Sequence, residues 1–260
     1  MADLKLTLIQ SSLVWEDIEA NIQNFTKKID EIQEETDIII LPEMFNTGYT
    51  MNSEKLGETM DGKTVNWMKK TAEQTHSVIV GSLIIKENQK HFNRLIWMKP
   101  DHSYEYYDKR HLFRFAGEDK YYTAGNRRVI VEHKGWKILL LICFDLRYPV
   151  WIRNKNEEYD LIICNANWPE PRNNAWKTLL EARAHENQTY VAGLNRIGKD
   201  GNDISFSGDS AVIDPKGKKL TSFEPHEEKT ETISLSMEEL NRFRKKFPVS
   251  MDADDFELKG

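Results

Sequence analysis

Residues 136–149 read Trp-Lys-Ile-Leu-Leu-Leu-Ile-Cys-Phe-Asp-Leu-Arg-Tyr-Pro and combine a buried strand with an abrupt turn. The run 138–144 is apolar throughout, which is typical of a strand covered on both faces. Polar residues follow at once, and Pro149 favours the start of a helix. A turn of this kind can present a nucleophile and aim a backbone N–H at a developing oxyanion. The stretch therefore predicts an α/β sheet with Cys143 at the carboxyl end of one strand.

Three other candidate strands also end in polar side chains. The run 38–41 leads into Pro42 and Glu43, residues 104–107 lead into the charged stretch that contains Lys109, and residues 161–164 lead into Asn165 and Asn167. Ligands of α/β sheets bind beyond the carboxyl ends of strands, so these positions favour function. Taken singly, each has an ordinary structural interpretation: a loop acid for Glu43, a solvated charge for Lys109, and an inert core thiol for Cys143 or Cys164.

Strands and helices alternate along the chain without a linker rich in Pro, Gly or Ser. We expect strands at residues 4–9, 38–41, 78–85, 94–99, 104–107, 129–132, 136–143, 161–164, 190–195, 204–213 and 218–223. We expect helices at residues 18–32 after an Asp17 cap, and at 64–75, 149–155, 175–188 and 236–246. This mixture predicts an α/β layered sandwich in one domain.

Composition narrows the class of protein. The 260 residues are 39% hydrophobic and 10% aromatic, which is enough for a large core. A net charge of −6 argues against binding to a nucleic-acid backbone. No basic–apolar leader opens the chain, and the longest apolar run has seven residues where a membrane helix needs about 20. Two cysteines are too few for a disulfide framework, so we expect a reducing, cytoplasmic location and no membrane partner.

Three short blocks make the chain recognisable. Leu41-Pro42-Glu43, residues 108–113 and residues 143–149 resemble the signature blocks of the nitrilase-like carbon–nitrogen hydrolases. Asn167-Trp168-Pro169, Trp176 and the segments 182–188 and 247–256 resemble the omega-amidase branch of that family. The resemblance covers about residues 4–247. It implies a four-layer α-β-β-α sandwich, one domain over 1–260 with its core at about 4–235, no cofactor, and a homodimer in which the C-terminal helix and tail, 236–260, are a candidate contact.

The resemblance also implies a catalytic set. Cys143 would attack an amide carbon to form a thioester, and Glu43 would take the thiol proton and pass it to ammonia. Free Glu and Cys differ by about 4 pKa units, or ~5.7 kcal/mol, so burial must raise the pKa of the acid and a cation must lower that of the thiol. Lys109 would supply the cation and, with the backbone N–H of Phe144, hold the oxyanion. Glu118 matches a second glutamate that positions Lys109 or the substrate, although Asp119 is only one residue away.

The implied substrates are short dicarboxylate monoamides: 2-oxoglutaramate, 2-oxosuccinamate and succinamate. Their far carboxylate suits an arginine fork, for which Arg172 is the first candidate and Arg114 and Arg196 compete. The other candidate substrate-binding residues are Phe45, Phe115, Asn167 and Trp168. We interpret Arg147 as structural, tying the turn after the nucleophile to an acid.

The sequence also allows alternative functions to be compared with an amidase. The seven histidines show no spacing typical of a metal site. A Cys–His hydrolase using His111 or His185 would leave the Glu43 block unexplained. A related amidase acting on N-carbamoyl compounds or aliphatic amides is the nearest alternative. A non-catalytic small-molecule binding protein is the alternative of a different class, and it would not need Cys143.

Overall fold

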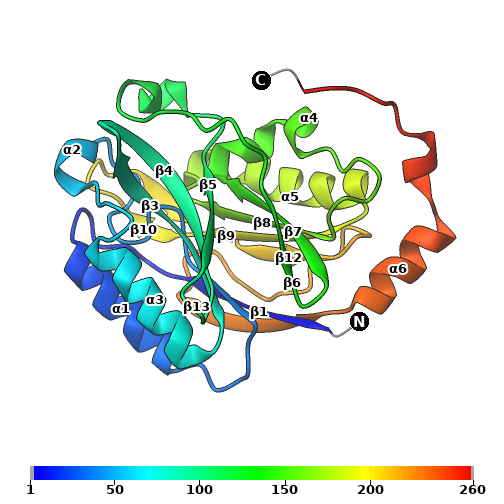
Figure 1. Cartoon of the computed structure of the whole chain (residues 1–260), viewed down its shortest axis with the longest axis horizontal. Helices are drawn as coiled ribbons and strands as arrows, with labels where there is room; N and C mark the ends of the chain where they lie inside the picture. The colour runs from blue at the N-terminus through cyan, green and yellow to red at the C-terminus, as the bar shows by residue number, and fades with distance from the viewer. Residues whose placement is uncertain (1–2, 259–260) are drawn as a thin grey trace.

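The computed structural model describes residues 3–258 and is built on two β-sheets (Figure 1). The larger sheet has the strand order β13 (Lys229–Leu235), β1 (Leu4–Gln10), β2 (Ile38–Ile40), β3 (Val78–Glu87), β4 (Lys90–Met98), β5 (Tyr104–Asp108). The second sheet has the order β12 (Ala211–Ile213), β9 (Tyr190–Asn195), β8 (Leu161–Ala166), β7 (Trp136–Ile142), β6 (Ile130–His133). A separate hairpin pairs β10 (Ile197–Lys199) with β11 (Ser205–Ser207).

Helices cover the outer faces of the two sheets (Figure 1). The helices are α1 (Ile18–Asp30), α2 (Ser53–Leu56), α3 (Lys63–Thr75), α4 (Pro149–Ile152), α5 (Asn173–Asn187) and α6 (Met237–Lys246). α1 and α3 lie against the larger sheet, and α5 lies against the second. The N-cap predicted for α1 is confirmed, because the Asp17 carboxylate accepts a hydrogen bond from the Ala20 amide at 3.0 Å.

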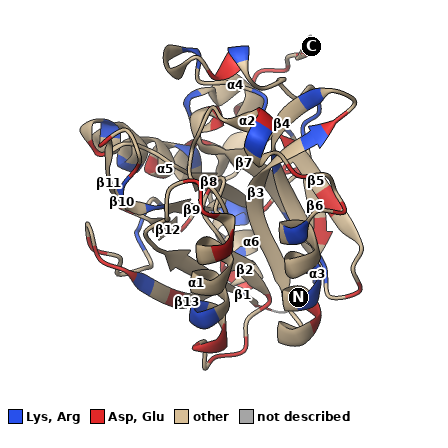
Figure 2. Cartoon of the chain, turned by 90° about the vertical axis from the view of Figure 1, so that its left-hand side faces the viewer, with Lys and Arg blue, Asp and Glu red and all other residues tan. Residues whose placement is uncertain are grey.

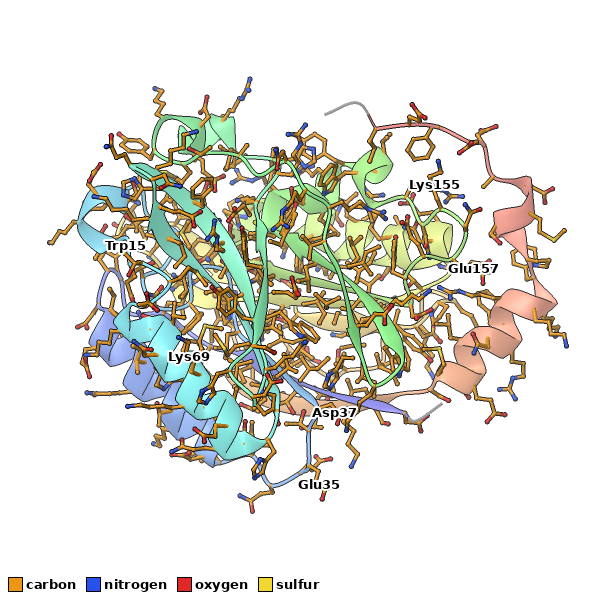
Figure 3. All side chains as sticks on the ribbon, viewed as in Figure 1. Trp15, Glu35, Asp37, Lys69, Lys155 and Glu157 are labelled. Carbon is orange, nitrogen blue, oxygen red and sulfur yellow. The ribbon has the colours of Figure 1, made fainter. Side chains whose placement is uncertain are left out.

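Alternation along the buried strands divides the core into layers. Ile38 and Ile40 of β2 belong to a cluster shared with the second sheet, whereas Ile39 packs with apolar residues of α1 and α3. Side chains fill the space between the sheets (Figure 3). The chain is thus an α/β sandwich with helix, sheet, sheet and helix in succession, as predicted.

Strand direction gathers the candidate residues. β1, β2 and β3 are mutually parallel, and β5 points the same way because β3, β4 and β5 alternate in direction. In the second sheet β7, β8 and β9 are parallel. The residues that follow β2, β5, β7 and β8 therefore emerge at the carboxyl edges of the two sheets, where ligands of α/β folds bind.

Some predicted elements differ from those observed. β13 was not predicted, because of its seven residues only Leu235 is buried, which leaves a weak alternating pattern. It pairs antiparallel with β1 along its whole length. The strand predicted at 218–223 is wrong, since this segment makes only an isolated bridge between Lys219 and Ile213. The strand predicted at 204–213 is two short strands, β11 and β12.

The chain leaves the sandwich through α6 and an extended C-terminal segment (Figure 1). That segment contains one short 3-10 turn of four residues, η5 (Val249–Asp252), and farther along Phe256 contacts Lys155 beyond α4. Within residues 3–258, every helix falls short of the length and apolar character that crossing a bilayer requires.

Candidate active site

Cys143 begins the turn that follows β7. Its φ of 45° lies in the left-handed region, which is unusual for a residue other than glycine and typical of a strained functional turn. The turn, η3 (Cys143–Arg147), is closed by Asp145, whose carboxylate accepts a hydrogen bond from the Ile142 amide at 3.1 Å. Cys143 retains 8% of its surface exposed and lines a narrow cavity. The predicted sharp turn after the strand is confirmed.

Glu43 follows β2 and is fully buried. Its Oε1 accepts hydrogen bonds from Lys109 Nζ at 2.9 Å and Asn93 Nδ2 at 2.8 Å, and its Oε2 accepts one from the Asn167 amide at 2.7 Å. The charge of this carboxylate also acts on the Cys143 thiol and raises its pKa. Glu43 is therefore a buried acid, and not a loop acid on the surface. It is bonded to Lys109 after β5, to Asn167 after β8 and to Asn93 within β4.

Lys109 lies between two carboxylates. Its Nζ is 2.9 Å from Glu43 Oε1 and 3.0 Å from Glu118 Oε1, and all three side chains are almost completely buried. Glu118 belongs to η2 (Glu118–Lys120) and also accepts the Phe113 amide. Asp119 instead faces the exposed Arg114 at 3.8 Å. The geometry thus places Glu118, rather than Asp119, beside Lys109.

The charges around the thiol explain its resting state. Burial raises the pKa of the Cys143 thiol well above its ordinary value, the charge of Glu43 adds to this, and Lys109 opposes it. Burial acts to lower the pKa of Lys109, but Glu118 and Glu43 outweigh it and hold that pKa well above its usual range. The cluster therefore contains a cationic lysine and a protonated thiol, so the thiol must give up its proton during attack. Lys109 acts to lower the pKa of the thiol, as expected, but burial and the charge of Glu43 outweigh it in the free protein.

Comparisons with known proteins show which family the chain belongs to. The family model for carbon–nitrogen hydrolases matches residues 5–245. The chain belongs to the carbon–nitrogen hydrolase family. It is 46% identical to the omega-amidase YafV of Escherichia coli (strain K12) over 258 residues, which are 99% of this chain and 100% of the relative. It is 34% identical to the 2-oxoglutaramate amidase of Bacillus subtilis (strain 168), covering 89% of this chain and 90% of that one.

A solved structure extends the likeness to three dimensions. A CN-hydrolase superfamily protein from Xanthomonas campestris, with an arsenic adduct in its active site, superposes with a TM-score of 0.97 at 41% identity over the full length of both chains. Like its omega-amidase relatives, the protein is a hydrolase that acts on the carbon–nitrogen bonds of amides.

Two arginines line the same cavity of the hydrolase as Cys143 and Lys109. Arg172, at the end of η4 (Glu170–Arg172), lines it with its guanidinium 5.2 Å from the Phe113 ring. Arg147 lines it as well, with its guanidinium 4.9 Å from the Trp168 ring. Neither side chain forms an ion pair with an acid in the described part of the chain. The interpretation of Arg147 as tied to an acid is therefore wrong.

The competing arginines lie elsewhere. Arg114 is exposed and faces Asp119. Arg196 is buried, and its guanidinium donates to the backbone carbonyls of Leu13, Ile197 and Lys199, which stabilises the β10–β11 hairpin. Burial lowers the pKa of Arg196 to about 10. Neither arginine lines the cavity.

The four predicted substrate contacts divide into two groups. Asn167 and Trp168 line the cavity, and the Trp168 indole N–H donates to the Arg172 carbonyl at 2.8 Å. Phe115 is 86% exposed and lies beyond the mouth, next to Arg172. Phe45 is fully buried against Phe25 and Trp67, away from the cavity, because Gly81 of β3 leaves room for its ring. The structure thus places Phe45 in the core.

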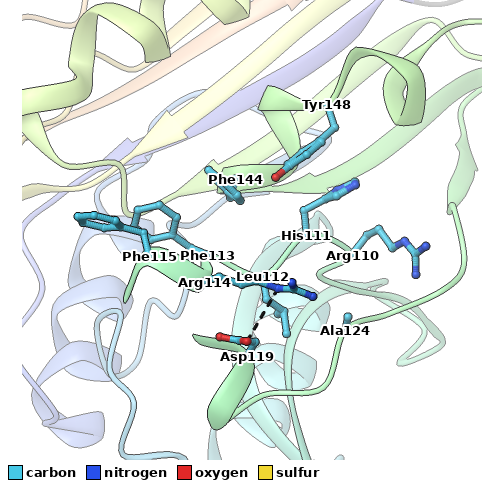
Figure 4. A pocket seen from close by; sticks show the side chains of 10 residues that line it. All are labelled: Arg110, His111, Leu112, Phe113, Arg114, Phe115, Asp119, Ala124, Phe144 and Tyr148. Atoms are coloured by element: carbon cyan, nitrogen blue, oxygen red, sulfur yellow. Dashed lines mark ion pairs between the residues drawn. The ribbon is translucent and has the colours of Figure 1, made fainter. Parts of the chain in front are cut away.

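A wider hollow of about 550 Å³ lies beside the cavity (Figure 4). Its wall includes His111, Arg114, Phe115 and Tyr148, and it shares Phe113 and Phe144 with the cavity. It contains neither Cys143 nor Lys109. His111 does not approach the thiol, since its ring stacks on Tyr148 and its Nδ1 bonds to Asp145 at 2.8 Å. Within residues 3–258 no cluster of His, Cys, Asp or Glu is suited to a metal.

Three contributions to the site were not predicted from the sequence: those of Asn93 and Tyr49, and the position of Arg147 in the cavity wall. Asn93 lies in the middle of β4 and donates to Glu43, with a longer contact to Glu118 at 3.4 Å. The sequence offers no clear signal for it, because Lys90, His91 and Arg94 of the same strand are polar as well. Tyr49 stands six residues after Glu43 and offers no pattern of its own; its ring lies 5.1 Å from Lys109 Nζ.

Proposed function

We propose that the protein is an omega-amidase that hydrolyses the terminal amide of short dicarboxylate monoamides such as 2-oxoglutaramate, 2-oxosuccinamate and succinamate. The observation that carries the proposal is Lys109 held between Glu43 and Glu118, in a cavity that Lys109, the Cys143 thiol and two arginines line together. The relatives named above, an omega-amidase and a 2-oxoglutaramate amidase, favour the same substrates.

In the acylation step the Cys143 sulfur attacks the amide carbon while Glu43 accepts the thiol proton. The carbonyl oxygen becomes an oxyanion that Lys109 and the Phe144 backbone N–H stabilise. The carbon–nitrogen bond then breaks, Glu43 returns its proton to the nitrogen, and ammonia leaves. A thioester on Cys143 remains.

Deacylation reverses the roles. A water molecule takes the place of ammonia, and Glu43 accepts one of its protons as the oxygen attacks the thioester carbon. Collapse of the second tetrahedral state breaks the carbon–sulfur bond, and the thiol recovers its proton from Glu43. Glu118 keeps Lys109 charged and in place throughout, since its carboxylate is bonded to Nζ.

We assign the far carboxylate of the substrate to Arg172 and Arg147. Both guanidiniums rest on aromatic rings and line the cavity that contains the thiol. An arginine that has no acid beside it is free to form a charge-assisted pair with a bound carboxylate. This recognition would select monoamides of diacids over plain aliphatic amides.

The decisive test is ammonia release over a panel of ω-amides, N-carbamoyl amines, nitriles and aliphatic amides. We expect 2-oxoglutaramate and succinamate to be turned over fastest, and Cys143→Ala to abolish release while the circular dichroism spectrum stays native. A preference for nitriles or carbamoyl compounds would refute the substrate class. Wild-type rates in Cys143→Ala would refute the thioester route.

A second experiment tests the arginines. Arg172→Ala and Arg147→Ala should each raise KM for succinamate by about 10-fold or more, as expected for loss of a charge-assisted bond. The same variants should leave KM for butyramide, which lacks the carboxylate, within about threefold. Equal effects on the two substrates would contradict the assignment.

We also propose a homodimer in a reducing compartment. Both cysteines are free thiols, and the mechanism needs Cys143 reduced. Large apolar side chains stay exposed at Val150, Phe247 and Met251, near α4 and along the C-terminal segment, which fits a partner surface. Light scattering on the purified protein should give twice the 30.5 kDa chain mass, and a monomer at micromolar concentration would exclude this.

A further inference from the structure

Two buried polar atoms face the cavity without a hydrogen-bond partner among the described residues: Tyr49 Oη and Asn167 Oδ1. A buried polar atom without a partner costs about 1–3 kcal/mol, so native proteins keep few of them. The other buried, unpartnered side-chain atoms belong to residues that do not line the cavity. These two positions therefore suggest a ligand that completes them.

The two atoms are chemically complementary. The Asn167 amide is oriented by its own contacts, because its Nδ2 donates to the Glu43 carbonyl, and its Oδ1 is therefore left as an acceptor. Tyr49 offers an O–H donor, and burial raises the pKa of Tyr49 well above its usual range, so the phenol keeps its proton. One donor and one acceptor beside the thiol match a primary amide, which presents a carbonyl oxygen and an NH₂ group.

Tyr49 lies at the reacting end of the cavity. Its ring is 5.1 Å from Lys109 Nζ, and the charges that act on its hydroxyl are those of Lys109, Glu118, Glu43 and Cys143. Asn167 is at the same end, since its backbone N–H donates to Glu43 Oε2 at 2.7 Å. Both residues thus lie beside the groups that are proposed to cleave the amide.

We propose that Tyr49 and Asn167 recognise the scissile primary amide: the Tyr49 hydroxyl donates to the carbonyl oxygen, and Asn167 Oδ1 accepts from the amide N–H. The inference rests on the proposed amidase chemistry and assigns the amide end of its substrate. Because the carbonyl oxygen gains charge in the tetrahedral state, the Tyr49 bond strengthens there and lowers the barrier.

The test compares two tyrosines near the site whose hydroxyls differ in having a partner. The Tyr49 hydroxyl has none among the described residues, whereas the Tyr122 hydroxyl donates to the Thr50 carbonyl at 2.6 Å. Tyr49→Phe should lower kcat for succinamate about 10- to 100-fold with little change in KM, and leave the midpoint of thermal unfolding unchanged or higher. Tyr122→Phe should lower the unfolding midpoint and keep kcat within about threefold.

The outcomes separate this inference from the proposed function. A Tyr49→Phe variant with kcat within threefold of wild type overturns the donor role, and a rise in KM alone shows that the hydroxyl contacts another part of the substrate and also overturns it. Hydrolysis of the N,N-dimethyl amide of succinate within tenfold of the succinamate rate overturns the Asn167 role, since that amide has no N–H. A wild-type protein that hydrolyses no amide of the panel would refute the proposed function instead.

Discussion

Lys109 illustrates how one residue's role depends on its immediate contacts. In the sequence it belongs to a charged run, Asp108-Lys109-Arg110-His111, of the kind that usually faces solvent. In the structure it is 1% exposed and bonded to two carboxylates. A buried cation in this position can hold a developing oxyanion only because Glu118 and Glu43 keep it charged.

Lys109→Met should therefore lower kcat at least about 100-fold, as expected for loss of an oxyanion donor. Lys120→Met is the matched control, because Lys120 is exposed on the neighbouring η2 turn. Steady-state ammonia release measures both. A change below threefold in the Lys109 variant would remove Lys109 from the mechanism.

Asn93 makes a related prediction. Its Nδ2 donates to Glu43 and contacts Glu118, so Asn93→Asp would replace a donor with a third carboxylate in the same buried cluster. We expect kcat to fall at least about tenfold because like charges at this distance disfavour ionised Glu43. Assays of Asn93→Asp and of Asn126→Asp, at an exposed asparagine, would show whether position 93 matters.

At the scale of elements, the edge strand β13 is held to its neighbours by Glu228, the residue just before it. Glu228 accepts hydrogen bonds from the Ser12 amide at 2.9 Å and from Lys28 of α1 at 2.9 Å. Burial acts to raise the pKa of Glu228, but these hydrogen bonds outweigh it and lower the pKa to about 2. The contact joins the start of β13 to the end of β1 and to α1.

A carboxylate with a lowered pKa stabilises the fold above its unfolded value, about 4.3, and that contribution is lost as the pH falls toward 2. We expect Glu228→Gln to reduce the free energy of unfolding by about 1 kcal/mol at pH 7, a small value because the side chain is partly exposed. The difference from wild type should shrink below pH 4 in urea titrations. Glu227→Gln, at the exposed neighbour, should differ little from wild type at any pH.

α6 is attached by a buried arginine. Arg244 bonds to Asp160 at 2.7 Å and to the carbonyls of Tyr159 and Gln188. Arg244→Ala should lower the free energy of unfolding by about 3–5 kcal/mol, because it leaves Asp160 and two carbonyls without this partner. Arg242→Ala, whose side chain is 70% exposed, should change it by less than about 0.5 kcal/mol. Similar losses in the two variants would show that Arg244 does not anchor the helix.

At the scale of the whole molecule, the two sheets share one core, and charged residues are interspersed over the surrounding ribbon (Figure 2). Leu140 of β7 is fully buried in that core. Leu140→Ala should lower the free energy of unfolding by about 2–5 kcal/mol, whereas Val14→Ala, at a position 49% exposed, should change it by less than about 0.5 kcal/mol. Urea unfolding followed by tryptophan fluorescence would measure both.

Local sequence patterns predict most of the helices and strands of this protein. Apolar runs such as 138–144, the Asp17 cap and the polar residues after each strand determine the elements, because burial and capping act over a few neighbours. These patterns, together with the three family blocks, also place Glu43, Lys109 and Cys143 at strand ends. The edge strand β13 was missed since its partner, β1, is more than 200 residues away and supplies most of what stabilises it.

Only the tertiary structure decided which side chains meet. Arg114, Arg147, Arg172 and Arg196 are alike in sequence, yet packing exposes the first, buries the last on carbonyls and brings the other two to the cavity. Phe45 and Tyr49 lie four residues apart, and the close approach of β3 at Gly81 puts Phe45 in the core while Tyr49 faces Lys109. A sequence determines what each segment can bury, but contacts between distant segments set the burial, and so the pKa and the free hydrogen-bonding capacity, of each group at the site.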